Sequence, residues 1–521
     1  NKTVLVLGWG RIRIGQGIEF DYCSVHCVWA LKAAGYDTVI VNNNPETVST
    51  DFDTSDRLYF EPLTAEDVIS ILEQEDPVGV VCQFGGQTAI SMAKHVIEAG
   101  FDIIGTDLKN IDRAEDREEF YTLLKRLKLN LPEGKTVFTT EQAVKAANKL
   151  GYPVLVRPSY VLGGKGMEIA YNETNIRDYM TIISREVQEH PVLVDKYILG
   201  TEIEVDAISD GEDVLIPGIM EHIERAGVHS GDSISVYPAG KKINEKQELE
   251  ILAITKALAR KDALNAKGII NIQFVVAGEK IYIIEVNPRS SRTVPYLSKV
   301  TGVPMIELAV RCSLGEKLKD MGYGTDLFPK RDLYAIKVPV FSHEKLPNVE
   351  VSLGPEMKST GEVLGVSKDY NEALSKGLIG SGVKIPKKGE GKVLITVAKK
   401  DLPEMEPIAQ RLERLGFTLY ATPGTANYLN KNYIAANVVN KIRYEENNIF
   451  DLMEGGDLKL IINTPTQGRN VDKDGFKIRR AAVERRIPVL TSLDTAKSVV
   501  DCIALDKTDS QLTPINLSEL F

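Results

Sequence analysis

Apolar runs and helical stripes alternate along the first 112 residues. Three short apolar runs, at residues 4–7, 38–41 and 78–82, are typical of buried parallel strands. Segments with apolar residues at helical spacing follow these runs, at residues 21–34, 65–73 and 88–99. This alternation predicts a doubly wound α/β unit, in which helices cover both faces of a parallel sheet.

Strands become more frequent in the next part of the chain. Apolar or alternating runs predict three strands before a hairpin, at residues 154–157, 192–197 and 202–209. Glycine and proline interrupt residues 317–388, which are expected to form a connecting region. The strongest linker signal is PKKGEGK at residues 386–392.

A second α/β alternation starts after this linker. Predicted strands lie at residues 393–398, 458–463 and 489–491. A helical stripe follows the first of them and consists of Met405, Ile408, Leu412 and Leu415. The pattern predicts a separate domain of about 130 residues, an ordinary domain size. The whole chain is expected to divide into four parts, at residues 1–112, 113–316, 317–388 and 389–521.

Length and composition fit a multidomain globular protein. A chain of 521 residues exceeds what one core supports, so roughly three to four compact units are expected. The net charge of −10 argues against non-specific nucleic-acid binding, and no apolar run reaches the roughly 20 residues of a membrane helix. The first strand begins almost at the terminus with no signal peptide before it, which suggests a fragment or split-gene product.

Five cysteines, an odd number, are scattered along the chain. They favour reduced thiols in a cytoplasm over a disulfide framework. Cys23 and Cys27 flank His26 in a predicted helix, but no second pair of metal ligands follows them. We therefore expect a structural role for both thiols.

Candidate chemistry is concentrated in a predicted hairpin at residues 271–293. Two strand-like runs flank a turn at residues 277–280. Glu285 and Asn287 lie two positions apart and share one face of the sheet, and closure of the hairpin brings Gln273 opposite Glu285. Carboxylate and amide oxygens on one rigid face suit Mg²⁺ beside ATP phosphates.

Arg289 and Arg292 follow directly after this hairpin. The guanidinium group of each can donate two hydrogen bonds to phosphate oxygens. The structural alternative is an edge hairpin with solvated polar residues. The remaining motifs of the chain favour the metal site over this alternative.

Two glycine-rich loops differ in what they predict. In the first, GWGRIRIGQG, Arg13 replaces the glycine of a dinucleotide fingerprint, and no Gly-Lys-Ser/Thr completes a P-loop. The second contains Gly163, Gly164 and Lys165, after a strand that ends in Arg157. Its backbone amides and mobile cation favour a loop that folds over phosphates, with an ordinary hairpin tip as the alternative.

Three carboxylates, Glu202, Glu204 and Asp206, alternate along a predicted strand and face one way. Such a face is unfavourable unless it meets cations or hydroxyl groups, so one carboxylate can bind a ribose. His229 lies in an irregular loop, where it can approach a phosphate or can simply be hydrogen-bonded. With no Ser-His-Asp or Cys-His arrangement, the motifs indicate Mg²⁺-assisted phosphoryl transfer from ATP.

Seven longer motifs stand out along the chain: RIGQGIEFDYCSVH (13–26), NNNPETVSTDFDTSDRLYFEPLT (42–64), RAEDREEF (113–120), RPSYVLGGKGMEI (157–169), EHIERAGVHSGDS (221–233), EVNPRSSRTVP (285–295) and LGPEMKSTGEVLG (353–365). Together they resemble the carboxyl-terminal half of the large subunit of carbamoyl phosphate synthetase. The resemblance covers nearly the whole chain and implies an ATP-grasp fold for the first 388 residues, with ATP between two α+β subdomains. It also implies a trailing methylglyoxal-synthase-like regulatory domain.

The same resemblance implies a cytoplasmic, ATP-dependent ligase that phosphorylates carbamate to carbamoyl phosphate for arginine and pyrimidine biosynthesis. ATP and Mg²⁺ or Mn²⁺ are the implied cofactors. The implied partners are an amino-terminal synthetase half that activates bicarbonate, a glutamine amidotransferase small subunit that supplies ammonia, and a small-molecule effector at the C-terminal domain. Neither nucleic acid nor a membrane is expected as a partner, and a homo-oligomer is left open.

Carried over by motif, the resemblance implies three groups of site residues. The nucleotide group comprises Arg117, Arg157, Gly163, Gly164, Lys165, Lys196, Ile198, Glu202, Gly227, Val228, His229 and Ser230. The metal group comprises Gln273, Glu285 and Asn287, and Asn287 acts on the transferring phosphoryl group together with Arg289 and Arg292. The effector group comprises Thr422, Thr425, Lys441 and Asn463.

The chain departs from the family in two regions. Trp9 and Arg11 stand where the family has a serine and a turn proline, which puts the geometry of the local crevice in question. Of three acids at the ornithine site of enteric relatives, Glu224 and Asp232 are present and the third is Val338, so we expect weak or no ornithine activation. Two rival interpretations stay open: another ATP-grasp carboxylase or ligase, such as a biotin carboxylase, and a non-catalytic nucleotide-binding regulatory paralogue.

Overall fold

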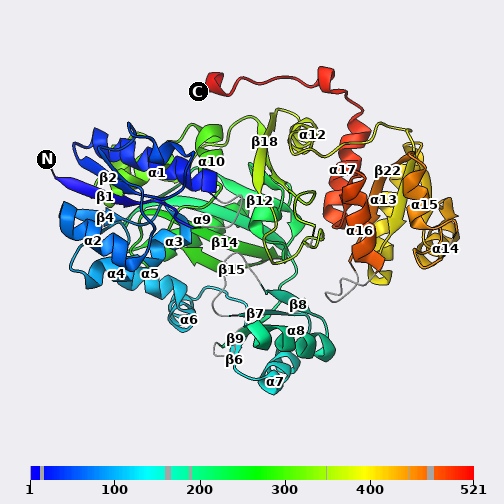
Figure 1. The fold of residues 1–521 in the computed structure, drawn as a ribbon, viewed down its shortest axis with the longest axis horizontal. Coiled ribbons are helices and arrows are strands. Elements are labelled where there is room, and N and C mark those ends of the chain that lie inside the picture. Colours follow the sequence, from blue (N-terminus) through cyan, green and yellow to red (C-terminus); the bar gives the residue numbers. More distant parts are fainter. Residues whose placement is uncertain are drawn as a thin grey trace.

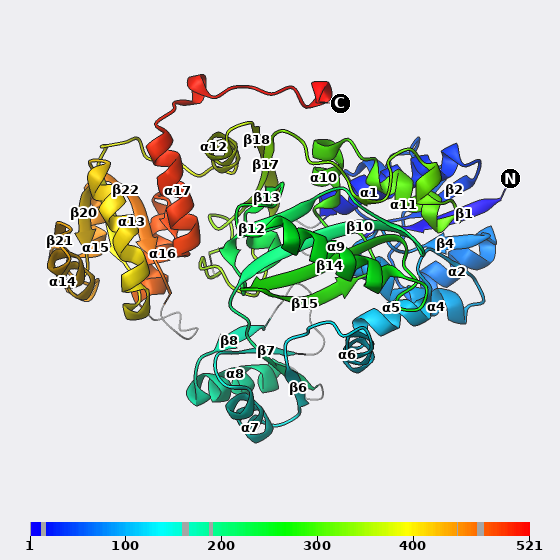
Figure 2. The same cartoon turned by 180° about the vertical axis from the view of Figure 1, so that it is seen from behind.

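Four sheets organise the chain. The computed structural model describes residues 2–11, 17–158, 166–186, 191–347, 349–444, 446–465 and 474–520. In these ranges the sheets have five, nine, five and four strands. The nine-stranded sheet lies in the middle, with the N-terminal unit at one end and the C-terminal domain at the other (Figures 1 and 2). None of the helices described is long and apolar enough to cross a membrane.

The N-terminal unit is the predicted doubly wound α/β layer. Its strands are parallel, in the order β3-β2-β1-β4-β5. The helix expected at residues 88–99 is instead two short helices, because the Met92 N–H donates to Ala89 O and closes a tight turn. The elements are β1 Thr3–Leu7, α1 Gly17–Ala33, β2 Asp37–Val41, β3 Arg57–Tyr59, α2 Ala65–Glu75, β4 Gly79–Val81, α3 Gly86–Ser91, α4 Ala93–Glu98, β5 Ile103–Ile104 and α5 Leu108–Glu115.

The smallest sheet forms a separate layer below the central sheet (Figure 1). Its strands run antiparallel in the order β6-β9-β7-β8, and two helices pack on it. Two strands predicted from the sequence are found here at nearly the expected residues. The elements are α6 Arg117–Arg126, β6 Gly134–Val137, α7 Thr140–Leu150, β7 Val154–Pro158, β8 Glu168–Ala170, α8 Glu173–Glu186 and β9 Val192–Lys196.

The nine-stranded sheet carries the predicted hairpin. It follows the order β15-β14-β10-β12-β13-β17-β18, with β11 beside β10 and β16 beside β11. The hairpin strands β14 and β15 pair with Gln273 opposite Glu285, and Gly278 supplies the positive φ (61°) of the turn. The elements up to the hairpin and its following helices are β10 Thr201–Asp210, β11 Val214–Ile216, β12 Ile219–Arg225, β13 Ser235–Tyr237, α9 Glu245–Ala259, β14 Lys267–Ala277, β15 Lys280–Asn287, α10 Val294–Thr301 and α11 Met305–Ser313.

The region expected only to connect domains extends this sheet. It contributes β16 Asp326–Leu327, β17 Tyr334–Val340, β18 Gly361–Ser367 and α12 Tyr370–Gly380. Strand β17 pairs with both β13 and β18. Gly365 lets α12 approach β18 closely, since a Cβ there would lie 2.1 Å from Ala373 O. Glycine and proline in this region therefore mark close packing as well as loops.

The C-terminal domain is the second predicted α/β unit. Its parallel strands follow the order β21-β20-β19-β22-β23. Strands β20 and β21 are added on one side of β19, and β22 and β23 on the other, so the order of strand addition reverses between β19 and β22. The predicted stripe lies on α13, where Met405, Ile408 and Leu412 are buried. The elements are β19 Lys392–Thr396, α13 Leu402–Arg414, β20 Thr418–Ala421, α14 Pro423–Lys431, β21 Ala436–Val438, α15 Ile449–Glu454, β22 Leu458–Asn463, α16 Asp474–Glu484, β23 Val489–Leu490 and α17 Leu493–Leu505.

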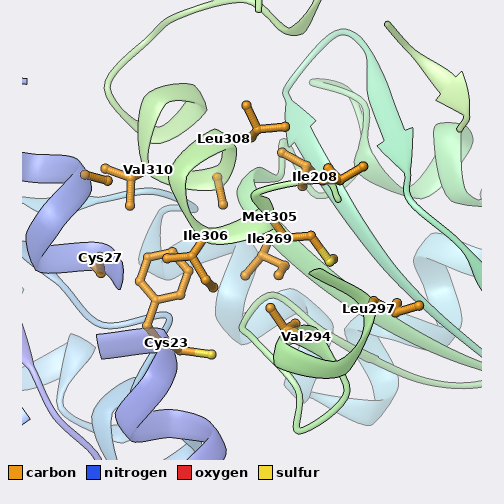
Figure 3. Close-up of a cluster of buried hydrophobic side chains, with 14 of the residues drawn as sticks. Cys23, Cys27, Ile208, Ile269, Val294, Leu297, Met305, Ile306, Leu308 and Val310 are labelled. Atoms are coloured by element: carbon orange, nitrogen blue, oxygen red, sulfur yellow. The ribbon is translucent and has the colours of Figure 1, made fainter. Parts of the chain in front are cut away.

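One hydrophobic cluster joins the N-terminal unit to the central sheet (Figure 3). Cys23 and Cys27 on α1 face Ile306 of α11 within it, and both are fully buried and free. Burial raises the pKa of each thiol, so neither is a ready thiolate. These observations agree with the expected structural role. The tail after α17 runs back across the molecule and packs Leu517 against the same cluster (Figure 1).

Candidate nucleotide and metal site

Two rows of polar side chains cross β10, β14 and β15. The pairing places Glu204 opposite Gln273 and Gln273 opposite Glu285. Two residues along, Asp206 lies opposite Asn271 and Asn271 opposite Asn287. Residues that pair directly share a face of the sheet, so the alternating sequence of β14 directs these amides to one side. Ile270, Ile272 and Phe274 fill the core on the other side.

The predicted metal group comes together on this face. Asn287 Nδ2 donates to Glu285 Oε1 at 2.7 Å, and Gln273 Nε2 donates to Ser230 Oγ at 3.4 Å. Because both amide nitrogens are engaged, the carbonyl oxygens of Gln273 and Asn287 can face a cation. The Glu285 side chain is exposed and provides the negative charge. The donors are hard oxygens of the kind that Mg²⁺ takes together with phosphate oxygens.

A buried acid cluster lies next to the metal group on β10. His222 is fully buried with its Nε2 3.6 Å from Glu204 Oε2, too long for a hydrogen bond. Among the described residues neither atom has a hydrogen-bond partner. Burial raises the pKa of Glu202 to about 7, although the charge of His222 opposes this shift. The cluster therefore contains buried polar atoms that have no hydrogen-bond partner among the described residues.

Asp206 is the best satisfied of the three acids. It accepts hydrogen bonds from Ser291 Oγ at 2.7 Å, Thr293 Oγ1 at 2.5 Å and Asn271 Nδ2 at 3.1 Å. Burial and the neighbouring Glu204 raise the pKa of Asp206 to about 7. Asp206 is therefore held in place by neighbouring side chains, whereas Glu202 lies near the start of β10.

Arg117 and Arg157, both predicted to contact the nucleotide, converge on one carboxylate. Arg117 Nη1 donates to Asp195 Oδ2 at 2.9 Å, and Arg157 Nε lies 3.3 Å from the same oxygen. Gly134 makes this approach feasible, since a Cβ there would lie 1.8 Å from Asp195 Oδ1. Lys196 behaves differently, because its Nζ donates to Gly151 O at 2.8 Å. The structure thus brings the two arginines together and ties the lysine to the backbone.

A loop after β12 reaches the metal group. Gly227 has φ +105°, and a Cβ there would lie 2.9 Å from Ile169 Cδ1 and Tyr197 Oη. Ser230 contacts Gln273, as described above. His229 Nδ1 accepts from Gly231 N at 3.0 Å, and burial lowers the pKa of His229. Nδ1 of His229 is therefore hydrogen-bonded within its own loop, which was the alternative to a contact with phosphate.

The two arginines after the hairpin diverge. Arg289 Nε donates to Gln87 Oε1 on α3 at 3.1 Å, and burial lowers its pKa. Arg292 Nη2 lies 3.1 Å from Glu19 Oε1 on α1 and 3.9 Å from Glu362 Oε2 on β18. Arg292 therefore sits in a charged cluster between the N-terminal unit and the central sheet, whereas Arg289 braces α3.

Sequence reasoning missed three members of this charged cluster. Lys337 Nζ lies 3.4 Å from Glu362 Oε2, and both side chains are buried or nearly so. Burial raises the pKa of Glu362, against the opposing charge of Lys337. A lone lysine inside the apolar strand YAIKVPV was an available signal. Glu19 and Glu362 gave no such signal, because each stands where an exposed acid would also fit.

Two glycine-rich features of the sequence can be placed only in part. Gly163, Gly164 and Lys165 lie outside the described residues. Trp9 covers the start of α1, since a Cβ on Gly17 would lie 2.6 Å from its ring. Arg11 is exposed, and its carbonyl oxygen accepts from Thr88 Oγ1 at 3.2 Å. Trp9 therefore packs against the start of α1.

The effector group lies at the carboxyl edge of the C-terminal sheet. Thr422 follows β20 and Asn463 ends β22, the two strands that flank β19. Thr422, Thr425 and Asn463 are buried, whereas Lys441 is exposed. Ligands bind at this edge in open parallel sheets, at the point where the strand order reverses. Arg479, which donates to Asn463 Oδ1 at 2.7 Å, was not anticipated.

Three parts of the chain match described families. Residues 1–113 match the carbamoyl phosphate synthase preATP-grasp domain. Residues 116–321 match the ATP binding domain of the carbamoyl-phosphate synthase L chain, and residues 404–491 match the MGS-like domain.

Several curated relatives are similar along the whole chain. The carbamoyl phosphate synthase large chain of Lachnoclostridium phytofermentans is 55% identical over 519 residues, which are 100% of this chain and 48% of that protein. The one of Clostridium perfringens strain SM101 is 55% identical over 501 residues, 96% of this chain and 47% of that protein. The chain thus spans about half the length of the curated relatives it matches.

Solved structures with lower identity share the fold. The biotin carboxylase domain of Hydrogenobacter thermophilus 2-oxoglutarate carboxylase, in complex with MgADP, ADP and bicarbonate, matches with a TM-score of 0.57 at 19% identity, over 73% of this chain and 89% of that chain. The ADP complex of N5-carboxyaminoimidazole ribonucleotide synthetase has a TM-score of 0.56 at 16% identity, over 73% and 96% of the two chains. These identities show the ATP-grasp fold alone. The matched domains and the curated relatives establish that the chain belongs to the carbamoyl phosphate synthase large-chain family.

Proposed function

We propose that this chain phosphorylates carbamate with ATP and yields carbamoyl phosphate and ADP, as the carboxyl-terminal half of a carbamoyl phosphate synthase large chain. The observation that carries the proposal is the face formed by Gln273, Glu285 and Asn287, with Ser230 in contact with Gln273. Arg292 lies beside the same loop, since a Cβ on Gly231 would lie 3.0 Å from Arg292 Nη1. Membership of the family and the ATP-grasp fold support it. The rival interpretations explain less, because neither a biotin carboxylase nor a non-catalytic paralogue accounts for both this face and the MGS-like domain.

In this proposal the chain's residues bind and orient two substrates. Glu202 accepts hydrogen bonds from the ribose hydroxyl groups, and Arg117 and Arg157 hold the phosphates. Six further residues line the nucleotide. These lining residues are Lys196, Ile198, Gly227, Val228, His229 and Ser230, and the loop with Gly163, Gly164 and Lys165 closes over the phosphates. Mg²⁺ or Mn²⁺, bound by the metal group with ATP, would neutralise phosphate charge.

The transfer itself needs little covalent chemistry from the protein. A carbamate oxygen attacks the γ-phosphorus, a new P–O bond forms, and the bond from phosphorus to the β–γ bridging oxygen breaks, so ADP leaves. Arg292 stabilises the charge on the equatorial oxygens, and Asn287 and Arg289 help to fix the geometry. The carboxylates of Glu19 and Glu362 orient the Arg292 guanidinium for this contact.

The back reaction tests this proposal directly. Purified chain, MgADP and carbamoyl phosphate should form ATP in a metal-dependent reaction, followed by coupled luminescence. No other subunit is needed, because both substrates meet at the one site. A folded chain that forms no ATP under these conditions would refute the proposed activity.

Nucleotide affinity should rise with pH around neutrality. Burial raises the pKa of Glu202 to about 7, above its ordinary value, so the neutral acid dominates below pH 7 and the carboxylate above it. A carboxylate accepts ribose hydroxyls better than the acid does, so MgADP should bind up to roughly tenfold more tightly at pH 8 than at pH 6. Calorimetric titration of MgADP measures this change. In Glu202→Gln the pH dependence should disappear, and its persistence would assign it to another group.

We also propose the four-part domain division, the cytoplasmic location and the partners that the family resemblance implies. The effector group at Thr422, Thr425, Lys441 and Asn463 is proposed to bind a small anionic ligand. Its hydroxyl, amide and cationic groups, at the carboxyl edge of a parallel sheet, support this assignment. The amino-terminal half and the glutamine amidotransferase subunit would act as partners in the complete enzyme.

Ornithine should have little effect on ATP formation. Glu224 already accepts from Thr495 Oγ1 at 2.7 Å and from Ile234 N at 2.8 Å. The Asp232 carboxylate accepts two backbone N–H groups, and Val338 is buried in an apolar cluster. A cationic ligand would thus find occupied acceptors and one missing carboxylate. Initial rates with and without ornithine measure this, and a strong activation would contradict the expectation.

A further inference from the structure

The start of α3 contacts the residues that follow β15, where the N-terminal unit meets the central sheet (Figure 1). Ser290 N donates to Gln83 O at 2.8 Å, and Arg289 Nε donates to Gln87 Oε1 at 3.1 Å. Both glutamines belong to residues 83–87, which connect β4 to the first turn of α3. The residues that come directly after the proposed metal group are therefore held by a separate unit of the chain.

Residues 83–87 are fixed on several sides. Gln83 Oε1 accepts from Ile269 N at 2.9 Å, and Gln83 Nε2 donates to Ser313 Oγ at 3.0 Å. A Cβ on Gly85 would lie 2.2 Å from Gly8 O, so only a glycine lets this backbone pack directly on the end of β1. Close packing of this kind leaves the segment little room to move, and Gln87 is held in one place.

Arg289 carries a positive charge that the described residues do not neutralise. Among them it forms no ion pair, whereas Arg292 pairs with Glu19. The acceptors that they offer to Arg289 are neutral, namely the amide oxygen of Gln87 and the carbonyl oxygen of Ser290, which lies 3.2 Å from Nη1. A guanidinium group has five N–H donors, so donors remain for a ligand.

The charge of Arg289 lies near the metal group. Burial lowers the pKa of Arg289, and the charges of Glu285, Glu115 and Asp206 oppose this shift, with Glu285 as the largest opposing effect. Glu285 is the carboxylate of the metal group, so the guanidinium is within electrostatic range of the bound cation and phosphates. A partly buried cation without a counter-ion is unfavourable, and an anionic ligand at this face would relieve that cost.

Gln87 lies between Arg289 and a carboxylate that would otherwise be able to neutralise it. Gln87 Nε2 donates to Glu115 Oε1 at 3.0 Å, at the end of α5, while its Oε1 accepts from Arg289. The neutral amide thus satisfies both charged groups and keeps them apart. Glu115 is exposed, so without this amide its side chain would be free to turn and form an ion pair with Arg289.

We propose that Gln87 is a positioning residue for the proposed phosphoryl transfer: it fixes the Arg289 guanidinium beside the metal group and separates it from Glu115, which leaves the positive charge for the anionic substrate. The substrate group that fits is a carboxylate or a phosphate, to which a guanidinium donates two parallel hydrogen bonds. A carboxylate at position 87 would accept the same hydrogen bond but would neutralise Arg289. The neutral amide is therefore the essential property of Gln87.

Chemical labelling of Arg289 tests this proposal without any catalysis. Phenylglyoxal reacts with the neutral form of the guanidine group, so a carboxylate in direct contact slows the reaction by holding the group charged. Mass spectrometry of peptides from the folded full chain measures the labelling rate at Arg289. Gln87→Glu should slow labelling by about tenfold or more, the effect of one or more pKa units from an adjacent opposite charge.

Further variants test the separation from Glu115. Gln87→Leu removes both hydrogen bonds of the amide and leaves Glu115 free to pair with Arg289, so labelling should also slow. Adding Glu115→Gln to Gln87→Leu removes that carboxylate and should restore most of the rate. Thr88→Val is the matched control on the same helix, because it removes the hydrogen bond from Thr88 Oγ1 to Arg11 O and leaves Gln87 in place. Arg289 should be labelled at the wild-type rate in this control.

The kinetic effect of Gln87 rests on the proposed function. In the back reaction, Gln87→Glu should raise the KM for carbamoyl phosphate by roughly tenfold or more, since a charge-assisted hydrogen bond to the substrate is weakened. The KM for MgADP should stay largely unchanged. A role in folding alone would instead raise both KM values or lower the unfolding temperature.

The labelling data can overturn the inference whether or not the chain makes ATP. Unchanged labelling of Arg289 in both Gln87→Glu and Gln87→Leu would mean that Gln87 does not control the guanidinium. Slow labelling in Gln87→Leu that persists after Glu115→Gln is added would contradict the separation from Glu115. A wild-type chain that forms no ATP would refute the proposed activity, and the labelling result would still decide the role of Gln87.

Discussion

Replacing Glu285 with alanine is expected to reduce ATP formation from MgADP and carbamoyl phosphate by at least roughly a hundredfold. Glu285 is the carboxylate of the proposed metal group, and the other two ligands, Gln273 and Asn287, are neutral amides. Without its charge the group cannot offset the cation's dehydration or hold it against the phosphates. Initial rates at saturating substrate, with Mg²⁺ and with Mn²⁺, measure the loss.

The same hairpin supplies the control for this variant. Glu279 lies in the turn, 80% exposed, with Lys246 Nζ 3.7 Å from its carboxylate. Glu279→Ala should therefore retain full activity. Because Glu285 is exposed and its side chain accepts a hydrogen bond from Asn287 on the same strand, both variants should unfold at the wild-type temperature. Near-normal turnover by folded Glu285→Ala would remove Glu285 from the mechanism.

Replacing Arg292 with methionine is expected to lower both activity and stability. The Arg292 side chain is 11% exposed and its partner Glu19 is 5% exposed. Removing the cation leaves Glu19 buried next to Glu362, a change that typically costs about 3–5 kcal/mol. ATP formation should fall by roughly a hundredfold or more, since the cation proposed to lie beside the transferring phosphoryl group is lost. Urea unfolding and initial rates measure the two effects.

A double variant separates the two roles of Arg292. Combining Arg292→Met with Glu19→Gln removes the unpaired charge, so most of the lost stability should return. Activity should stay low, because the cation is still absent. If activity returned along with stability, Arg292 would matter only for folding and would have no direct part in phosphoryl transfer.

The hairpin was the most predictable part of the candidate site. Alternation of side chains is a local property of a strand, and the turn residues fix the register. From these rules the sequence alone predicted Gln273 opposite Glu285, and the structure confirms that pairing. The doubly wound units at both ends were predictable for the same reason, because apolar runs and helical stripes are local patterns.

Contacts between distant segments were not predictable in this way. Glu19 and Arg292 are 273 positions apart, and Glu350 and Arg479 are 129 positions apart. Each of these residues alone looks like an ordinary surface charge in the sequence. The region at residues 317–388 was underestimated because the three strands it adds to the central sheet are separated by irregular segments, which dominate its composition.

The sequence by itself determined the order of units, the hairpin with its face of polar side chains and the family to which the motifs belong. These follow from side-chain spacing and long motifs, which are written into neighbouring residues. Only the tertiary structure decided that Arg292 joins Glu19 and Glu362, and that Arg479 links Asn463 to Glu350. Such pairs depend on how separate units pack against each other. Packing buries side chains that look like surface charges in the sequence, and a buried charge requires a specific partner.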